Sequence, residues 1–390
     1  MTRLLEILIS MAIVAVLFLV VGVVLPSSRS LSESVETNRR ISIVFDTINS
    51  LRRFDDWSAI SAYDPAAQLN ISGPEEGVGA RVDYVSDVDR VGEGSWEITE
   101  SEPDRRVAFA VDNSDLGSNK RTAFTLTPTG RNNRNVEITQ TYNVDYGWNL
   151  FGRYSGLYVS RSVGDQMKLG LGRLTNILAA VPNVEYRVEG SKLGNLMVEE
   201  RPSEHLLVVN AGAVERNNDV IKASMKANME WINRTIAASN LEAVGPMRVI
   251  TTELGRETYT FDIAQRVRRG SGAAPGAEDA ATDAGDADAT AAADAVPAAP
   301  VAGAGPPLAN LRLQGPVTYV QTAPASVAKA SYIGFMAELD NVRNAVRAWA
   351  VTRGYAVADR PYEDYKNGID AAFTESGEYD VYWTLGQPQQ

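Results

Sequence analysis

The stretch APASVAKASYIGFMAELDNVRNAVRAWAVTRGYAVADRPYEDY, residues 323–365, decides the architecture of the second half of the chain. The run over 326–334 predicts a strand, and Pro361 marks the start of a hairpin that finishes with GEYDVYW at 377–383. Between them a helix is indicated, because apolar residues recur at helical spacing at Leu339, Val342, Val346, Trp349 and Ala350.

The same order of elements occurs over residues 195–268, with a proline at Pro246 and a closing hairpin over 255–263. We therefore predict an internal duplication of a strand–helix–strand–strand unit within 195–386. Residues 270–308 separate the copies and are almost wholly Ala, Gly, Pro, Asp and Thr. Such a composition buries too little apolar area to offset the entropy of ordering, so it predicts a disordered linker.

Residues 30–185 predict a different domain. Apolar spacing over 41–57 indicates an amphipathic helix, and a second helix is expected over 160–180. Between them, alternating segments predict strands at 79–85, 96–99, 107–111, 124–126 and 136–144. The predicted fold class is therefore α+β, with an antiparallel sheet domain that precedes the duplicated domain.

Residues 4–25, LLEILISMAIVAVLFLVVGVVL, carry one charge, Glu6, and can cross a membrane as a helix. A cleaved signal peptide has a shorter apolar core and a small-x-small cleavage site, and a buried core helix has polar interruptions. The segment therefore predicts a retained transmembrane helix. Basic residues after it, such as Arg29, favour a cytoplasmic body, but a short N-terminal tail commonly stays inside. We expect the body outside the cytoplasm.

Composition excludes several classes of site. Lys and Arg total 37 against 49 Asp and Glu, a net charge of -12, which disfavours nucleic acid as a partner. The chain has no Cys and a single His, His205, so disulfides, thiolate zinc sites and multi-His metal sites are excluded. We predict no cofactor and no metal. His205 lies at a strand start, and a structural role is expected for it.

The segments FDTINSLRRFDDWSAI (45–60), EGVGARVDYVSD (76–87), GSWEITESEPDRRVAF (94–109) and TAFTLTPTGRNNRNVEITQTY (122–142) resemble the START-like helix-grip superfamily, also labelled SRPBCC or polyketide cyclase-like. The resemblance implies a curved sheet around the last helix and an apolar cavity for lipids or other hydrophobic ligands. The candidate cavity residues are Trp96, Phe109, Phe124, Tyr142 and Met167. The same side chains also suit an ordinary core, and no catalytic residue stands out.

Residues 323–386, with EERPSEHLLVVNAGAV (199–214) and VGPMRVITTELGRETYTFDI (244–263), resemble the GyrI-like effector-binding domain, also called AraC-type. The long linker departs from that family, and no helix-turn-helix is evident. The resemblance implies a cleft between the halves in which aromatic rings and a carboxylate bind apolar or cationic molecules. The candidate ligand residues are Tyr362, Glu363, Tyr365, Glu378, Trp383, Glu257 and Tyr319. An exposed hairpin or an ordinary core would use the same residue types.

Together these observations predict a bacterial, single-pass membrane protein that binds a hydrophobic or cationic small molecule without catalysis. Two alternatives stay open. A hydrolase-type or cyclase-like enzyme would need an activated carboxylate in the cleft, such as Glu363 or Glu378. A lipid carrier would need a large apolar cavity within 30–185.

The membrane anchor is directly testable. Deleting residues 1–28 should release a soluble body from the membrane fraction, because only the segment 4–25 is apolar enough to hold it there. Fractionation of cells that express each form measures this. Release of the full-length chain by carbonate or high salt would contradict the prediction.

Overall fold

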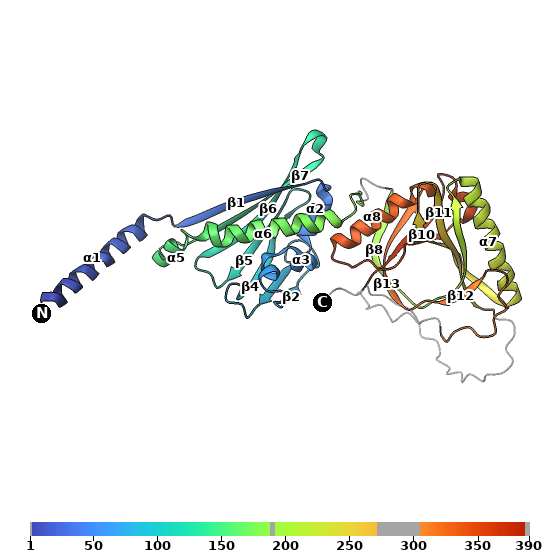
Figure 1. The fold of residues 1–390 in the computed structure, drawn as a ribbon, viewed down its shortest axis with the longest axis horizontal. Helices are drawn as coiled ribbons and strands as arrows, with labels where there is room; N and C mark the ends of the chain where they lie inside the picture. The colour runs from blue at the N-terminus through green and yellow to red at the C-terminus, as the bar shows by residue number, and fades with distance from the viewer. Residues whose placement is uncertain (1, 188–191, 271–304, 387–390) are drawn as a thin grey trace, which may run out of the picture. The chain divides into compact units, whose positions relative to one another are not determined.

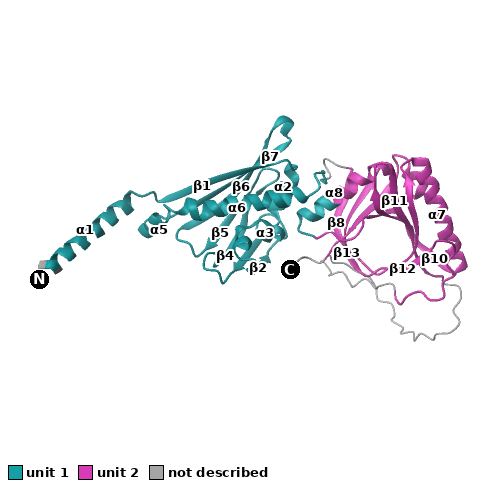
Figure 2. Cartoon of the chain, in the orientation of Figure 1, with its two compact units in different colours: residues 1–187, 347–355, 388–390 teal, residues 188–346, 356–387 magenta. Residues whose placement is uncertain are grey.

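The computed structural model describes residues 2–187, 192–270 and 305–386. Helices and strands are labelled as in Figure 1. The chain divides into two compact units, shown in Figure 2. The first contains the residues up to 187 and the segment 347–355, and the second contains the other described residues. The α+β class, with an N-terminal apolar helix and two antiparallel sheets, is confirmed. Most of the predicted linker, residues 271–304, lies outside the described residues.

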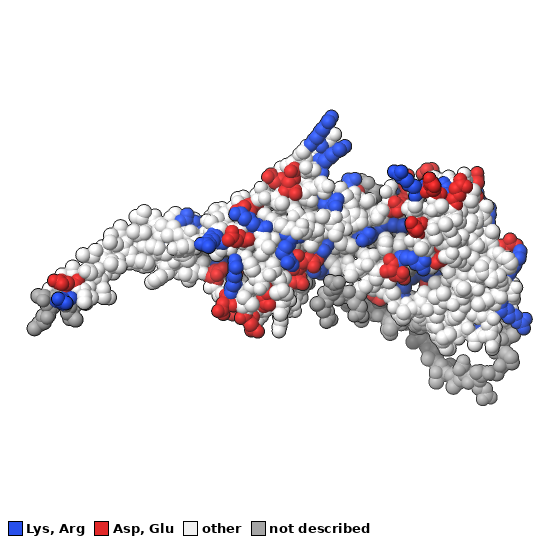
Figure 3. All heavy atoms as spheres, viewed as in Figure 1, with Lys and Arg blue, Asp and Glu red and all other residues white. Residues whose placement is uncertain are grey.

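The first helix, α1 (Thr2–Val24), contains a run over Leu5–Val24 that is long and apolar enough to cross a membrane. Figure 3 shows it as an uncharged rod except near its N-terminal end, where Arg3 and Glu6 lie. A signal sequence meets the same criteria of length and composition. What is established is therefore one helix with the properties of a membrane span.

The first unit is built on a seven-stranded antiparallel sheet in the order β1-β7-β6-β5-β4-β3-β2. Its strands are β1 (Ser28–Thr37), β2 (Gln68–Ser72), β3 (Arg81–Val85), β4 (Glu93–Glu102), β5 (Arg106–Asn113), β6 (Ser118–Thr129) and β7 (Asn135–Asp145). Its helices after α1 are α2 (Ile41–Asn49), α3 (Phe54–Trp57), α4 (Ala59–Tyr63), α5 (Leu150–Ser155) and α6 (Val159–Ala180), with short 3-10 turns at Leu51–Arg53 and Arg131–Asn133.

The helix predicted over 41–57 is interrupted. Ser50 has an extended backbone (φ -106°, ψ 119°) and forms an isolated bridge with Glu76, so α2 ends at Asn49. The last predicted helix is found as α6, one residue longer at its start. It lies along the sheet in Figure 1, and its buried residues include Met167, Leu171 and Leu174.

An aromatic cluster fills the core between α3 and the sheet. Trp57 packs edge-on against Trp96 and Phe124, and Phe109 packs edge-on against both Trp96 and Phe124, with ring centroids 5.5–6.2 Å apart. Phe54 joins the cluster through Trp57 and Trp96. Edge-to-face contacts of this kind add to the stabilisation from burial. Strand alternation brings these rings to one side of the sheet, where they hold α3 in place.

The second unit contains an eight-stranded antiparallel sheet in the order β12-β9-β11-β10-β14-β15-β13-β8. Its strands are β8 (Leu193–Arg201), β9 (His205–Glu215), β10 (Leu241–Leu254), β11 (Thr258–Arg269), β12 (Thr318–Gln321), β13 (Ala325–Ile333), β14 (Tyr362–Tyr365) and β15 (Glu378–Thr384). Its helices are α7 (Asn218–Ala238), α9 (Gly368–Ala372) and the first part of α8 (Leu339–Thr352), which follows a 3-10 turn at Met336–Glu338.

The duplicated halves exchange their first strands. β8 belongs to the first copy but pairs with β13 of the second, and β12 of the second copy pairs with β9 of the first. At the centre of the sheet, β10 pairs antiparallel with β14, Met247 opposite Tyr365 and Ile250 opposite Tyr362. The two copies therefore form one continuous sheet, and each copy completes the other's edge.

The aromatic cluster predicts a stability effect in the first unit. Phe109 is fully buried, so Phe109→Ala should lower the free energy of unfolding by about 3–5 kcal/mol, through lost burial and the cavity that remains. Urea unfolding of the body that lacks residues 1–28, followed by tryptophan fluorescence, measures this change.

Leu116→Ala is the control, because this side chain is 49% exposed and its loss should change stability by only about 0.5 kcal/mol. Equal effects of the two substitutions would show that the cluster does not hold this unit together.

Candidate functional site

A cleft of about 640 Å³ opens on one face of the sheet of the second unit. Alternation along the strands decides which side chains reach it. On β10, Arg248 and Ile250 line the cleft, whereas Val249 is fully buried on the face that α7 and α8 cover in Figure 1. The other wall residues come mainly from β9, β11, β12 and β14, namely Leu206, Val208, Asn210, Asp262, Thr318, Val320 and Tyr362.

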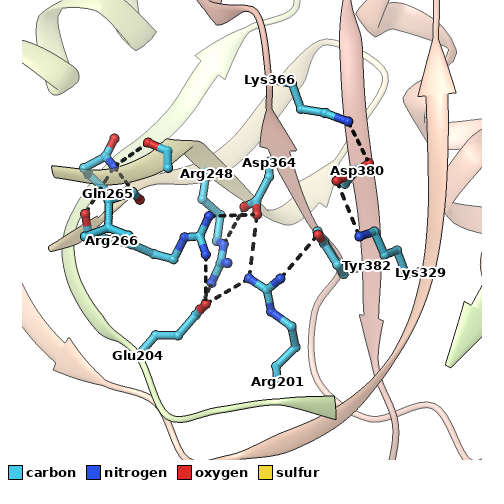
Figure 4. A network of polar contacts seen from close by, with 12 residues as sticks. Arg201, Glu204, Arg248, Gln265, Arg266, Lys329, Asp364, Lys366, Asp380 and Tyr382 are labelled. Carbon is cyan, nitrogen blue, oxygen red and sulfur yellow. Dashed lines mark hydrogen bonds and ion pairs between the residues drawn. The ribbon is translucent and has the colours of Figure 1, made fainter. Parts of the chain in front are cut away.

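Three arginines converge on two carboxylates beside this cleft (Figure 4), and Arg201, Glu204 and Arg248 line its wall. Arg248 binds both acids, with Nε 2.9 Å from Asp364 Oδ1 and Nη1 2.8 Å from Glu204 Oε2. Arg201 Nη2 lies 2.8 Å from Glu204 Oε1, and Arg266 Nη1 lies 3.3 Å from the same oxygen. We call these five residues the arginine cluster. They come from β8, the turn after it, β10, β11 and β14, so the cluster depends on strands from both copies.

Aromatic rings support the guanidinium groups. The Arg248 guanidinium carbon lies 4.2 Å from the centre of the Tyr362 ring, and that of Arg201 lies 4.9 Å from the Tyr382 ring. The two rings stack with centroids 4.8 Å apart. Planar guanidinium groups stack well on aromatic faces and keep their edges available for anions. Tyr362 and Tyr382 therefore fix the planes of two of the three arginines.

The five residues of the arginine cluster carry three guanidinium groups against two carboxylates. A third acid outside this set, Glu199, lies 3.1 Å from Arg201 Nη1 and 3.0 Å from Lys329 Nζ. Burial opposes ionisation of Glu204, but Arg248 and Arg201 outweigh it and lower the pKa of this carboxyl. Burial likewise opposes the charge of Arg248, but Asp364 and Glu204 outweigh it and raise its pKa. The formal charge of these five side chains is therefore +1 at neutral pH.

Several donors of the arginine cluster have no acceptor. Arg248 is only 3% exposed, and its Nη2 has no hydrogen-bond partner in the described part of the chain. The Nε atoms of Arg201 and Arg266 are also buried and unpartnered there. Buried donors without acceptors carry a free-energy cost, which an anionic ligand group can remove. This cleft therefore combines apolar walls with nearby buried donors that have no acceptor.

The ligand residues predicted from sequence fall on both faces of the sheet. Tyr362 lines the cleft. Its neighbour Glu363 is fully buried on the other face, where Arg343 Nε of α8 lies 2.5 Å from its Oε1. Tyr365 is buried on that face, and Trp383 donates its indole N–H to the Arg343 carbonyl oxygen at 2.7 Å. The Glu363 carboxylate is thus already paired with a cation from its own unit.

The remaining predicted ligand residues lie apart from the cleft wall. Glu257 and Glu378 are exposed near strand ends, and Glu378 borders a separate surface hollow beside Tyr332. The Tyr319 hydroxyl lies 2.7 Å from Nδ1 of His205, and both strand neighbours of Tyr319 line the cleft while Tyr319 does not. The structure therefore does not bring these side chains together with Tyr362.

Sequence reasoning missed the arginine cluster. One signal was present, because Arg248 is a charged residue inside the apolar run of β10, and Asp364 follows Glu363 at the opposite parity. Adjacent residues of a strand point to opposite faces, so Glu363 and Asp364 must lie on different faces of the sheet. Which acid faces the cleft can be assigned only when the pairing partner of β14 is known. Glu204 lies in a turn and shows no local signal.

The first unit holds a smaller cavity of about 100 Å³. Of the predicted cavity residues, Trp96, Tyr142 and Met167 line it, whereas Phe109 and Phe124 are buried in the aromatic cluster. Burial, and secondarily the charge of Asp115, raises the pKa of Tyr84 in this wall to about 12. Clefts that bind drug-sized ligands measure ~300–1,000 Å³, so this cavity is small for such a ligand.

No group of three His, Cys, Asp or Glu side chains suited to a metal ion occurs among residues 2–187, 192–270 and 305–386. The single histidine, His205, is 8% exposed and bonded to Tyr319.

The lowered pKa of Glu204 predicts an acid-dependent stability. A carboxyl whose folded pKa lies below its ordinary 4.5 stabilises the fold above that pH and loses this contribution as pH falls through the folded value. Glu204→Gln should therefore destabilise the second unit at pH 7, by roughly 1–3 kcal/mol. The gap to wild type should narrow progressively below pH 4.5.

Urea unfolding at a series of pH values measures this gap, with Glu257→Gln, at an exposed turn, as the control. A gap that is the same at pH 3 as at pH 7 would show that Glu204 does not act through its charge.

Comparisons with known proteins find no matching family profile and no matching curated protein. Among solved structures, the chain is similar to the C-terminal domain of EcmrR, with 10% identity and a TM-score of 0.34 over 49% of this chain and 97% of that one. It is also similar to a Thalictrum flavum norcoclaurine synthase, with 12% identity and a TM-score of 0.31 over 39% and 95% of the two chains. Protein Ms6760 from Mycobacterium smegmatis matches with 15% identity and a TM-score of 0.28, over 39% and 91%.

Proposed function

We propose that this chain is a membrane-anchored protein that binds a small molecule in the cleft of the second unit, and that the ligand joins an apolar body to an anionic group. The observation that carries the proposal is the arginine cluster, with its net positive charge and unpartnered buried donors at the wall of a cleft of about 640 Å³. Arginine pairs with carboxylate, sulfonate or phosphate through parallel N–H donors. Leu206, Val208, Ile250 and Val320 supply apolar wall.

This proposal keeps the hydrophobic ligand expected from sequence and changes its charge. The cationic ligand was expected because of Glu363, whose carboxylate lies behind the sheet on Arg343. Three acids line the cleft, and each lies near an arginine. Glu204 is paired within the arginine cluster, Asp262 Oδ2 lies 3.0 Å from Arg360 Nη1, and Asp359 Oδ1 lies 3.9 Å from Arg360 Nε. A cation would have to compete with arginines already in contact with these acids. An anion would find donors without acceptors.

The two alternatives from sequence have less support. A lipid carrier would place its ligand in the first unit, where the cavity measures about 100 Å³. An enzyme that uses Glu363 would need that carboxylate to reach substrate, and Arg343 and the sheet separate it from the cleft. The membrane anchor in this proposal is α1. We also propose that the residues after α1 lie outside the cytoplasm.

Binding can be tested with three fluorescent probes and the body that lacks residues 1–28, which avoids competition from detergent. The probes are 11-(dansylamino)undecanoic acid, its neutral methyl ester and the cation rhodamine 6G. The acid should bind more tightly than the ester. Arg248→Met should weaken the acid about tenfold or more, since a hydrogen bond to a charged group contributes ~1.5–3 kcal/mol, and should change ester binding little.

Two controls locate the effect. Arg234→Met removes an exposed arginine of α7 and should leave all three affinities unchanged. Val208→Trp fills the cleft from its wall and should abolish binding of acid and ester alike. Circular dichroism of each variant checks that it is folded, and Arg201→Met replaces Arg248→Met if the latter is not.

Three results would contradict the proposal. Equal affinity for the acid and the ester would show that the arginine cluster does not bind the anionic group of the ligand. If rhodamine 6G binds tightly and Glu363→Gln weakens this binding, the ligand is a cation, as the sequence predicted. Unchanged binding in Val208→Trp places the ligand outside this cleft.

A further inference from the structure

The segment between β7 and α6 exposes an unusual amount of aromatic surface. Trp148 is 81% exposed, Phe151 71% and Tyr158 70%, and all three lie within or beside the short helix α5. Single exposed apolar residues are common on soluble proteins, but a group of large aromatic side chains marks a contact surface. These residues follow β7 in the chain. β7 pairs with β1, and β1 is the first element after α1.

Hydrogen bonds fix α5 to the last turns of α1. Arg153 is 7% exposed, and its Nη1 donates to the carbonyl oxygens of Gly22, Val23 and Leu25 at 2.8–3.3 Å. These belong to the end of a helix, where carbonyl groups lack partners within the helix. Arg153 also donates to the Gly147 carbonyl oxygen at 2.6 Å, so one guanidinium joins α1 to the turn before α5.

Aromatic packing supports the same contact. The Tyr154 ring stacks on Phe18 with centroids 4.4 Å apart, and its hydroxyl donates to the Phe18 carbonyl oxygen at 2.7 Å. Gly22 permits the close approach, because a Cβ there would meet Leu150 and Tyr154 at 3.3 Å. The exposed rings follow from this anchor. Phe151 lies 5.5 Å from Phe18 between ring centres, and Trp148 lies 5.3 Å from the Arg153 guanidinium.

The contact sets the depth of α5 relative to α1. Phe18 precedes the end of α1 at Val24 by six residues, or about 9 Å at the ~1.5 Å rise of a helix. If Leu5–Val24 crosses a ~30 Å hydrocarbon layer, its last turns lie at the edge of that layer. Side chains held against those turns must then lie between that edge and about 9 Å inside it, in the interfacial zone where Trp and Tyr are enriched in membrane proteins.

We propose that α5 and its flanking residues, with Trp148, Phe151 and Tyr158, lie in the headgroup region of the membrane that α1 crosses. The first unit would then contact the bilayer at a second place, through an interfacial helix, in addition to its covalent link to α1. The inference rests on the membrane anchor of the proposed function, and it names the lipid interface as the partner of this surface.

The absence of Cys from the chain permits a single-label experiment on the full-length protein. Phe151→Cys, labelled with an NBD fluorophore, is reconstituted into vesicles of phosphatidylcholine and phosphatidylglycerol. Lipids with a nitroxide near the headgroup quench a label in the interface, and iodide quenches a label in water. The control is Arg131→Cys in the turn at the other end of β7, since that eleven-residue strand spans about 35 Å.

We expect the label at 151 to be quenched strongly by the nitroxide lipid and several-fold less by iodide than the label at 131. Tyr158→Cys should behave as 151 does. A label at 151 that iodide reaches as freely as 131, in protein that still resists carbonate extraction, would overturn the interfacial contact and leave the anchor intact.

Release of the full-length protein by carbonate would instead overturn the anchor itself. Protection of 151 from both quenchers would show that a second copy or another protein covers α5, and would also overturn the lipid assignment.

Discussion

The pairing of β14 between β10 and β15 determines the chemistry of the second unit. This four-residue strand sends Tyr362 and Asp364 to the cleft side and Glu363 and Tyr365 to the helix side. Antiparallel pairing with both neighbours fixes that register, since a shift by one residue would exchange all four side chains between the faces. Arg248 meets Asp364, and Arg343 meets Glu363, only in the observed register.

Two ionic systems therefore lie back to back across one strand. Behind the sheet, Glu363 Oε1 and Arg343 form a buried ion pair, supported by Tyr259, with both side chains at most 6% exposed. Glu363 Oε2 has no hydrogen-bond partner in the described part of the chain. Burial of such a pair contributes little net stability, although loss of one partner is costly. In front, the arginine cluster has one cation more than it has acids and keeps donors unpartnered. The first arrangement lies behind the sheet, away from the cleft, whereas the second lies beside the cleft and is suited to receive a further acceptor.

The sequence predicted those features that depend on local periodicity. The helical spacing of Val163 to Leu178 and the alternation of Val136 to Val144 reappear as α6 and β7, because each pattern reflects one buried face. Features that depend on partners distant in the chain were not predictable. Glu363 and Asp364 are adjacent acids in the same strand, and only the register with β10 separates their roles. The break at Ser50 has the same origin, since its bridge partner Glu76 lies in another segment. The helix α5 is six residues long, too short for any period to emerge.

The exchange of β8 and β12 makes the two duplicated halves depend on each other. Each copy leaves its own sheet one strand short and supplies that strand to the other copy. A single copy would therefore be incomplete alone, because its first strand pairs in the other copy. By the same geometry, a nick in the chain between β11 and β12 would leave two fragments that stay paired at fifteen positions. Seven of these join β8 to β13, four join β12 to β9, and four join β10 to β14.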